Sequence, residues 1–533
     1  MSFGKDSFLA QWLPAAVLCG ALAAAAGAAP APKEPALSQD QQIAKLIQAL
    51  GDKDYAVRQR AEDELARIGF AAYEALAAAA NHEDLEIAAR ARYLLRKMRG
   101  QLAGEEDLPE VQEILQDYEL RSAVERASRI RYLAFLPDLR GTTALCRLVR
   151  FEPSDLLSDY AALEIMYEEP FDRASRARLR GLLKANLADS SRPGAKWLLC
   201  FVRLGEDPKT VLPEWRRLVE AEYSRWQQAP DKANPEIAVG LLYLLAQACA
   251  EQGDRAAADK TAQQAQRVPR PSDLLGLVLR MQTAWMLGHR GSPAWAETEY
   301  RFLISCGQAA VVTDSGHRFA EYLYDQGKPL AAAEVYQKTL EAMDQRRFDA
   351  GRERDSVIRG RARMNYFRAC HWLGQKDPVK QLYYLERALQ ADPGEIDSLI
   401  ACYRLPSVPP PFRERIVKSI QQETARSRDE MAKDPKSPFP CNQLAWLVCN
   451  TQGDLDEALR ASQKSLELSP NTSAYLDTLA HVYFANGDLA NAVKYQTLAV
   501  EREPHSGLLN SELKRFRAAL EENAKKGGEK PQQ

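Results

Sequence analysis

Two pairs of residues have side-chain types and a spacing that could serve metal binding or nucleophilic catalysis. His317 and Glu321 stand four positions apart, so on one helix both would face the same way, and both are of types that bind divalent metals. No third ligand is identifiable near them, and the same spacing fits residues that pack on a neighbouring helix. Cys370 and His371 are adjacent, and neighbouring helical residues point about 100° apart, so they form no thiolate–imidazole pair. We therefore predict no metal site.

Motifs that mark common catalytic sites are missing from the sequence. There is no G-x-S-x-G, no H-E-x-x-H, no Walker A run and no G-x-G-x-x-G. The cysteines form no C-x-x-C pair, which excludes zinc ribbons, thioredoxin-like redox motifs and c-type haem attachment. The sequence thus predicts a protein that is not an enzyme and has no cofactor. A hydrolase or metal-dependent enzyme with scattered residues within 100–235 stays as a weaker alternative.

A cluster of arginines could bind negatively charged groups. Between Arg346 and Arg368 there are eight arginines and three acids, a local net charge of +5. Bidentate arginine contacts from this stretch would suit an acidic or phosphorylated partner. The alternative is a solvated loop and helix face. The aromatic residues among the arginines are too irregular for a platform on which bases stack, and we predict no nucleic-acid partner.

The whole chain has the composition of a folded protein. Of its 533 residues, 46% are apolar and 27% are charged, with a net charge of −2. This composition excludes a disordered polymer, a collagen-like fibre and a multi-pass membrane protein, and the near-neutral charge gives no nucleic-acid or membrane-surface footprint.

The N-terminal residues predict export. An apolar run from Leu13 to Ala26 is shorter than the ~20 residues that span a bilayer, and Ala26-Gly27-Ala28 supplies a cleavage pattern. We expect a signal peptide at 1–28, a linker at 29–40, a periplasmic or extracellular location and no membrane span after cleavage. An uncleaved membrane anchor is the alternative. Eight cysteines remain after cleavage, and most lie in apolar helical patterns, which favours buried thiols over disulfides.

Self-comparison reveals a repeat near the C-terminus. Gly453-Asp454-Leu455 matches Gly487-Asp488-Leu489 at an offset of 34, and Ala458 and Pro470 match Ala492 and Pro504. This pattern resembles the tetratricopeptide repeat, a helix–turn–helix of ~34 residues. The resemblance implies that Ala480 and Ala492 let two helices cross closely. Weaker copies are centred on Gly253, Gly291 and Gly327, with a degenerate one around Gly374.

The front of the chain has a different period. Asp54, Val57, Ala61 and Leu65 recur as Asp84, Ile87, Ala91 and Leu95 at an offset of 30. This stretch resembles a HEAT-like repeat, in which an Asp and an Arg, here Asp54 and Arg58, tie neighbours together. The second unit has Ala88 in place of the arginine.

These patterns predict an all-α protein, an α-solenoid of stacked helical hairpins, HEAT-like and then tetratricopeptide-like. We expect HEAT-like repeats at 41–100, helices of no recognised family at 101–235, tetratricopeptide-like repeats at 236–394, an irregular helical connection at 395–437, two further repeats at 438–506, and a C-terminal helix with a disordered tail at 507–533.

The tetratricopeptide resemblance also implies a binding groove. The first helix of each repeat lines the concave face of such an array. Carried over to this sequence, the inward positions supply the candidate groove residues: Tyr243, Trp285, His289, His317, Glu321, Tyr324, Asp477, His481 and Phe484. Aromatic and mixed polar side chains in a concavity suit peptide binding, whereas the alternative is a solvated helix face without a role.

The sequence therefore favours a non-enzymatic scaffold that binds a protein or peptide partner through its concave face. The alternative is a structural or assembly component of the cell envelope that acts by self-association.

Overall fold

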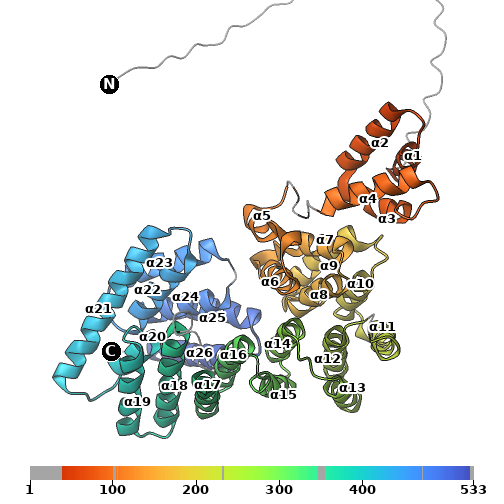
Figure 1. The fold of residues 1–533 in the computed structure, drawn as a ribbon. Helices are drawn as coiled ribbons and strands as arrows, with labels where there is room; N and C mark the ends of the chain where they lie inside the picture. The colour runs from red at the N-terminus through yellow and green to blue at the C-terminus, as the bar shows by residue number, and fades with distance from the viewer. Residues whose placement is uncertain are drawn as a thin grey trace, which may run out of the picture. The chain divides into compact units, whose positions relative to one another are not determined.

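The regular structure of the chain is helical. A computed structural model describes residues 39–99, 102, 104, 106–230, 233–345, 354–470 and 472–528, and within them no strand occurs. The predicted signal peptide, most of the linker and residues 529–533 of the tail lie outside the described residues. The all-α fold class is confirmed, and successive helices pack as neighbouring pairs, as expected for an α-solenoid (Figure 1).

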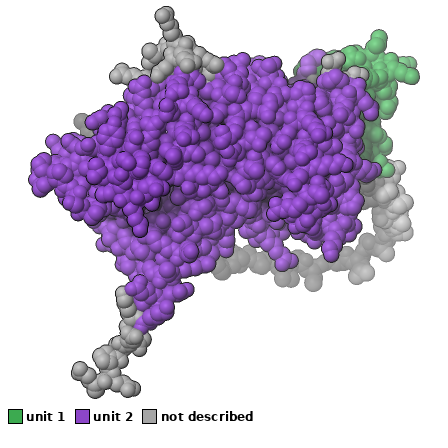
Figure 2. Space-filling view, turned by 90° about the horizontal axis from the view of Figure 1, so that it is seen from below, with its two compact units in different colours: residues 1–95 green, residues 96–533 purple. Residues whose placement is uncertain are grey.

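Two compact units divide the chain. Unit 1 comprises residues 1–95 and unit 2 comprises residues 96–533, and Figure 2 colours them green and purple. The described helices of unit 1 are α1 (Gln39–Ala49), α2 (Tyr55–Ile68), α3 (Tyr73–Ala79) and the greater part of α4 (Leu85–Arg99).

The period of 30 residues in unit 1 arises because α2 and α4 begin with the same capping arrangement. Asp54 and Asp84 each accept a backbone amide two residues on, at 2.8 Å, so each begins its helix in the same way. Arg58 of α2 donates to the carbonyl of Asp52 at 2.7 Å and pairs with Glu86 of α4 at 3.2 Å. The link between the two helices is therefore made by the arginine and a glutamate.

The front half of unit 2 consists of helices from the region for which the sequence suggested no family. These are α5 (Pro109–Leu115), α6 (Ala123–Ala134), α7 (Thr142–Phe151), α8 (Asp155–Tyr167), α9 (Arg173–Leu187), α10 (Pro193–Leu204) and α11 (Pro208–Gln228).

Helical hairpins follow. They are α12 (Pro235–Glu251) with α13 (Arg255–Arg267), α14 (Leu274–His289) with α15 (Pro293–Leu303), α16 (Ala309–Asp325) with α17 (Pro329–Gln345), and α18 (Arg354–Gly374) with α19 (Pro378–Ala391). The last two hairpins are α22 (Pro438–Asn450) with α23 (Leu455–Leu468) and α24 (Ser473–Ala485) with α25 (Leu489–Arg502), followed by α26 (Gly507–Gly528).

The turn inside each hairpin explains its sequence signature. Gly453 and Gly487 have positive φ, and the aspartate that follows each caps the next helix. Glycine adopts this left-handed conformation without the steric penalty of a Cβ atom. In the degenerate copy, Lys376 takes the left-handed position with φ of 56°, and Gly374 stays in the helix. The turn has moved by two residues, which is why that copy is weak.

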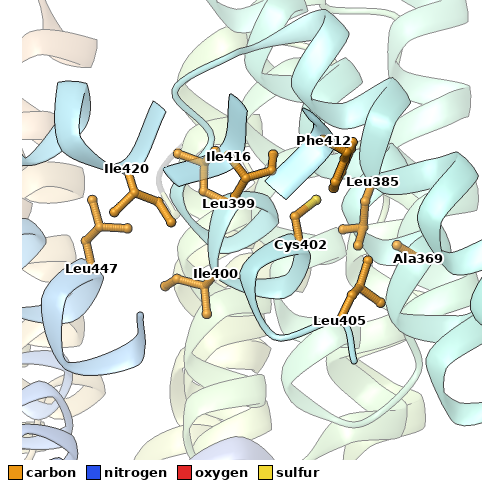
Figure 3. Close-up of a cluster of buried hydrophobic side chains, with 10 residues drawn as sticks. All are labelled: Ala369, Leu385, Leu399, Ile400, Cys402, Leu405, Phe412, Ile416, Ile420 and Leu447. Carbon is orange, nitrogen blue, oxygen red and sulfur yellow. The ribbon is translucent and has the colours of Figure 1, made fainter. Parts of the chain in front are cut away.

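A buried cluster joins the array across its irregular part. The connection contains α20 (Ile396–Tyr403) and α21 (Pro410–Lys433). Leu385 of α19, Leu399 of α20, Ile416 of α21 and Leu447 of α22 pack in one core with neighbouring apolar residues (Figure 3). The hairpins on either side of the connection thus share a continuous core.

Candidate functional site

The array of hairpins curves back so that its end contacts its earlier helices. Asp325, at the end of α16, accepts hydrogen bonds from Ser506 Oγ at 2.6 Å and from the backbone amides of Gly507 and Leu508 at 3.1 and 3.3 Å. These are the first residues of α26, so a side chain from another repeat caps this helix. Figure 1 shows α26 beside α25, against which it packs.

A second set of contacts strengthens this closure. Arg502 pairs with Asp172 at 3.0 Å, across 330 positions of sequence. The ring of His505 lies 5.8 Å from that of Phe171, and Gln326 donates to the carbonyl of His505 at 3.1 Å. Residues 502–508 therefore contact two separate parts of unit 2, at residues 171–172 and at residues 325–326. We call this set of contacts the closure.

A cavity lies beside the closure. It has a volume of about 650 Å³, and residues of α14, α16 and the start of α26 line it. Five of the residues expected in the groove lie along its wall: Trp285, His289, His317, Glu321 and Tyr324. We call it the closure cavity.

One end of the closure cavity is built from stacked rings and a buried cation. The rings of Trp285 and His289 stack with their centroids 4.7 Å apart. The guanidinium of Arg131 lies 4.7 Å from the Trp285 ring and 4.1 Å from the Phe135 ring, a cation–π arrangement. Burial, aided by the nearby Arg290, lowers the pKa of His289 to about 4, so His289 is neutral at physiological pH.

A second cavity adjoins the first. Its volume is about 860 Å³, and His317, Arg363 and Asp397 line both cavities. Its wall comes from α16, α17, α18, α22, the start of α20 and the segment before it. Four carboxylates line it: Asp314, Asp392, Glu395 and Asp397. We call it the acidic cavity.

The shared wall is an ion-pair cluster around one arginine. Arg363 pairs with Glu321 at 2.7 Å, with Asp397 at 2.7 Å and with Glu395 at 3.2 Å. One guanidinium faces three carboxylates, so the cluster retains excess negative charge when all are ionised. Burial and the neighbouring Asp397 raise the pKa of Glu395. The guanidinium also lies 4.8 Å from the centroid of Phe367.

Tyrosines fix the positions of the predicted side chains. Tyr336 donates to Glu321 at 3.2 Å and also pairs with Nδ1 of His317. The Tyr324 ring stacks on Phe367 with centroids 4.5 Å apart, and its hydroxyl lies 3.1 Å from that of Tyr366. His317 and Glu321 are therefore held by a tyrosine and an arginine. Within the described residues, no group of three metal-ligating side chains is assembled.

Apolar residues of the acidic cavity were not among the residues expected from sequence. Trp446 donates its indole proton to Asp397 at 3.1 Å, and the side chain of Phe439 is 55% exposed at the cavity. Both lie on α22, the first helix of the penultimate repeat, but neither occupies an inward position of the repeat pattern, which in this copy are Gln443, Leu447, Asn450 and Thr451. Arg363 lies in the arginine-rich stretch, whose residues 346–353 lie outside the described part of the chain.

The other four expected residues lie away from both cavities. Tyr243 is fully buried and donates to Glu299 at 2.6 Å, in a core network with Arg280. In the last repeat, the rings of His481 and Phe484 lie 5.1 and 4.6 Å from that of Phe516 on α26. Asp477 accepts a hydrogen bond from Gln496 at 2.8 Å. The chain's own C-terminal helix thus covers the last repeat.

One family model matches this chain. The match is to the tetratricopeptide repeat, over residues 474–506. These residues form α24 and α25, and the hairpin at 438–468 likewise has a glycine of positive φ followed by an aspartate that caps its second helix. None of the curated proteins compared with the chain matches it.

The match supports an interaction protein, because tetratricopeptide repeats generally mediate contacts between proteins and are usually non-catalytic. No helix in the described part of the chain has both the length and the apolar character that crossing a bilayer requires.

Proposed function

We propose that this protein is a non-enzymatic scaffold that binds an extended segment of a partner protein in the closure cavity and the acidic cavity. The observation that carries the proposal is that two adjacent cavities share the side chains of Arg363, Asp397 and His317 in their walls, across successive first helices of the array. A repeat array presents such a surface along its concave side, and an extended peptide contacts several repeats at once.

The wall chemistry suits a peptide. Trp285, Trp446 and Phe439 offer apolar contact area, and neighbouring carboxylates offer acceptors for backbone amides and polar side chains. Tyr324 and Glu321 are already positioned by contacts within the chain. Partner binding therefore has to order few side chains, and less of the binding free energy is lost as side-chain entropy.

The remaining proposals concern the front of the chain. We propose that residues 1–28 direct export and that unit 1 is a HEAT-like section. The equivalent caps Asp54 and Asp84 and the Arg58–Glu86 pair support the latter. Mass spectrometry of the N-terminus of the mature protein tests export, since a cleaved chain begins after Ala28.

Site-specific photo-crosslinking tests the binding function. The photoreactive residue p-benzoylphenylalanine, placed at Phe439 on the acidic cavity, is expected to capture a partner from the native host. The matched control is Tyr383, an exposed aromatic residue of α19 that lines neither cavity. Specific capture at Phe439 supports the proposal, and equal capture or no capture at both positions contradicts it. A capture product made of two copies of this chain supports self-association instead.

A further inference from the structure

Negative charge is concentrated in the two cavities. Four carboxylates and two arginines, Arg359 and Arg363, line the acidic cavity. The closure cavity adds Glu321, Asp325 and Glu503 and one further arginine, Arg318. The full chain has a net charge of only −2. Seven carboxyl groups and three arginines therefore line the cavities; burial raises the pKa of two of the seven, Glu395 and Glu503, and the other five still outnumber the arginines.

The single positive charge of Arg363 does not balance the carboxylates that surround it. Arg363 is shared by Glu321, Glu395 and Asp397. Asp392 accepts the backbone amide of Gly394 at 3.0 Å and forms no ion pair among the described residues. A second cationic group that enters the acidic cavity would therefore meet carboxylates that Arg363 does not neutralise.

The chain itself shows how guanidinium groups are held at these walls. Arg131 lies against the rings of both Phe135 and Trp285 and pairs with Glu164 at 2.8 Å. Arg363 lies on the rings of Tyr366 and Phe367, 5.0 and 4.8 Å from their centroids, among its carboxylates. Trp446 places its ring beside Asp397, which is the same combination of aromatic ring and acid, and the exposed Phe439 lines the same cavity.

We propose that the partner segment is a basic peptide, extended across both cavities, with one arginine or lysine in each cavity and an apolar side chain on Phe439. This inference rests on the proposed function and specifies its partner. Exposed Phe439 supplies the apolar contact, Asp392 supplies negative charge in the acidic cavity, and Glu503, which accepts from Ser473, supplies an acceptor in the closure cavity.

Defined peptides provide the test. A fluorescein-labelled peptide of about ten residues, with two arginines and two leucines spaced by alanine and glycine, is long enough for an extended chain to span adjacent cavities at ~3.3 Å per residue. Fluorescence anisotropy with the full chain is expected to show binding. Replacing both arginines by glutamine should weaken binding at least about tenfold, and glutamate should abolish it. Binding should also weaken as salt rises from about 50 to about 300 mM.

Charge-neutral variants locate the site. Asp392→Asn and Asp314→Asn are each expected to weaken binding of the arginine peptide by about three- to tenfold. Asp429→Asn, an exposed carboxylate of α21 away from both cavities, is the matched control and should leave binding unchanged. Circular dichroism checks that each variant keeps its helical content.

The outcomes separate this inference from the proposed function. Equal binding of the arginine and glutamine peptides, or equal weakening by Asp392→Asn and Asp429→Asn, overturns the basic-partner inference. If Phe439 captures a partner by crosslinking but the arginine peptide does not bind, the partner chemistry is wrong and the scaffold function stands. If Phe439 captures nothing and no peptide binds, both are overturned.

Discussion

The hairpin α16–α17 and the last repeat, α24–α25, have similar inward positions but different surroundings. In the last repeat, Phe516 of α26 packs on Phe484 and His481. On α16, Glu321 and Tyr324 line an open cavity. An inward position in a repeat therefore predicts that the side chain lies on the concave face. Whether that face is covered or open depends on the rest of the chain. The C-terminal helix occupies it at one end, and the two cavities leave it open in the middle.

The largest expected effect comes from removing the Phe516 ring, which covers the last repeat, and it tests the difference between the covered and open repeats. Phe516 is fully buried, so Phe516→Ala is expected to lower the free energy of unfolding by about 3–5 kcal/mol through lost apolar burial and a cavity. Urea unfolding followed by circular dichroism measures it. The matched variant is Phe439→Ala at the open cavity, which should change stability by less than about 0.5 kcal/mol. Similar losses in both variants would show that the two surfaces are equally packed.

The closure is tested by a side chain at Gly507. A Cβ atom there would come too close to the backbone carbonyl of Asp325, so Gly507→Val should separate α26 from α16. We expect a loss of about 1–3 kcal/mol in unfolding free energy and faster proteolysis of the C-terminal segment.

The control for this variant is Gly181→Ala. Gly181 lies within α9, and an added Cβ atom there meets no atom within 4 Å. It should stabilise the protein by up to about 1 kcal/mol, because alanine is the better helix former. An unchanged proteolysis rate in Gly507→Val would indicate that the closure does not hold α26 in place.

The cover over the last repeat also predicts a pH dependence. Burial, aided by Glu512, raises the pKa of Asp477 to about 7. The carboxyl is ionised in the unfolded chain and protonated in the folded protein below about pH 7, so its contribution to stability is lost as pH rises through that value. Between about pH 6 and about pH 8 the loss is about 1.4 kcal/mol.

The variant Asp477→Asn isolates this effect. Asparagine keeps the oxygen that accepts from Gln496 and cannot ionise, so the difference in unfolding free energy between variant and parent should grow from pH 6 to pH 8. His481 acts in the opposite direction, because burial lowers its pKa to about 3 and the unfolded chain takes up the proton as pH falls through about 6.5; it is present in both proteins and so cancels in this difference. A pH-independent difference would show that Asp477 is not enclosed by α26.

The local repeat was predictable from sequence, and the closure was not. Gly487 takes a left-handed turn at the matched repeat position, and Ala480 and Ala492 are fully buried where two helices cross. A period specifies how each hairpin packs on the next. The contact between Arg502 and Asp172 depends instead on small rotations accumulated over many hairpins, which no short pattern specifies.

In the candidate site, too, contacts within one helix were predictable from sequence and contacts between distant segments were not. His317, Glu321 and Tyr324 were expected together because they share one face of a single helix. Asp397 was missed because it belongs to α20, in the connection that breaks the period, and only the fold brings it to Arg363. The arginine-rich stretch suggested an acidic partner, but charge on a sequence does not reveal that three of the chain's own carboxylates already hold Arg363.

The smallest expected effect concerns the wall of the open cavity. Tyr324→Phe keeps the ring stacked on Phe367 and removes the hydroxyl that lies 3.1 Å from Tyr366. We expect a loss of about 0.5–1.5 kcal/mol in unfolding free energy, typical of one hydrogen bond. Unlike Phe516→Ala, this variant should leave the packing of α26 and its proteolysis unchanged. A loss as large as that of Phe516→Ala would mean that the open wall depends on a single hydroxyl, and that the contrast between the covered and open repeats is wrong.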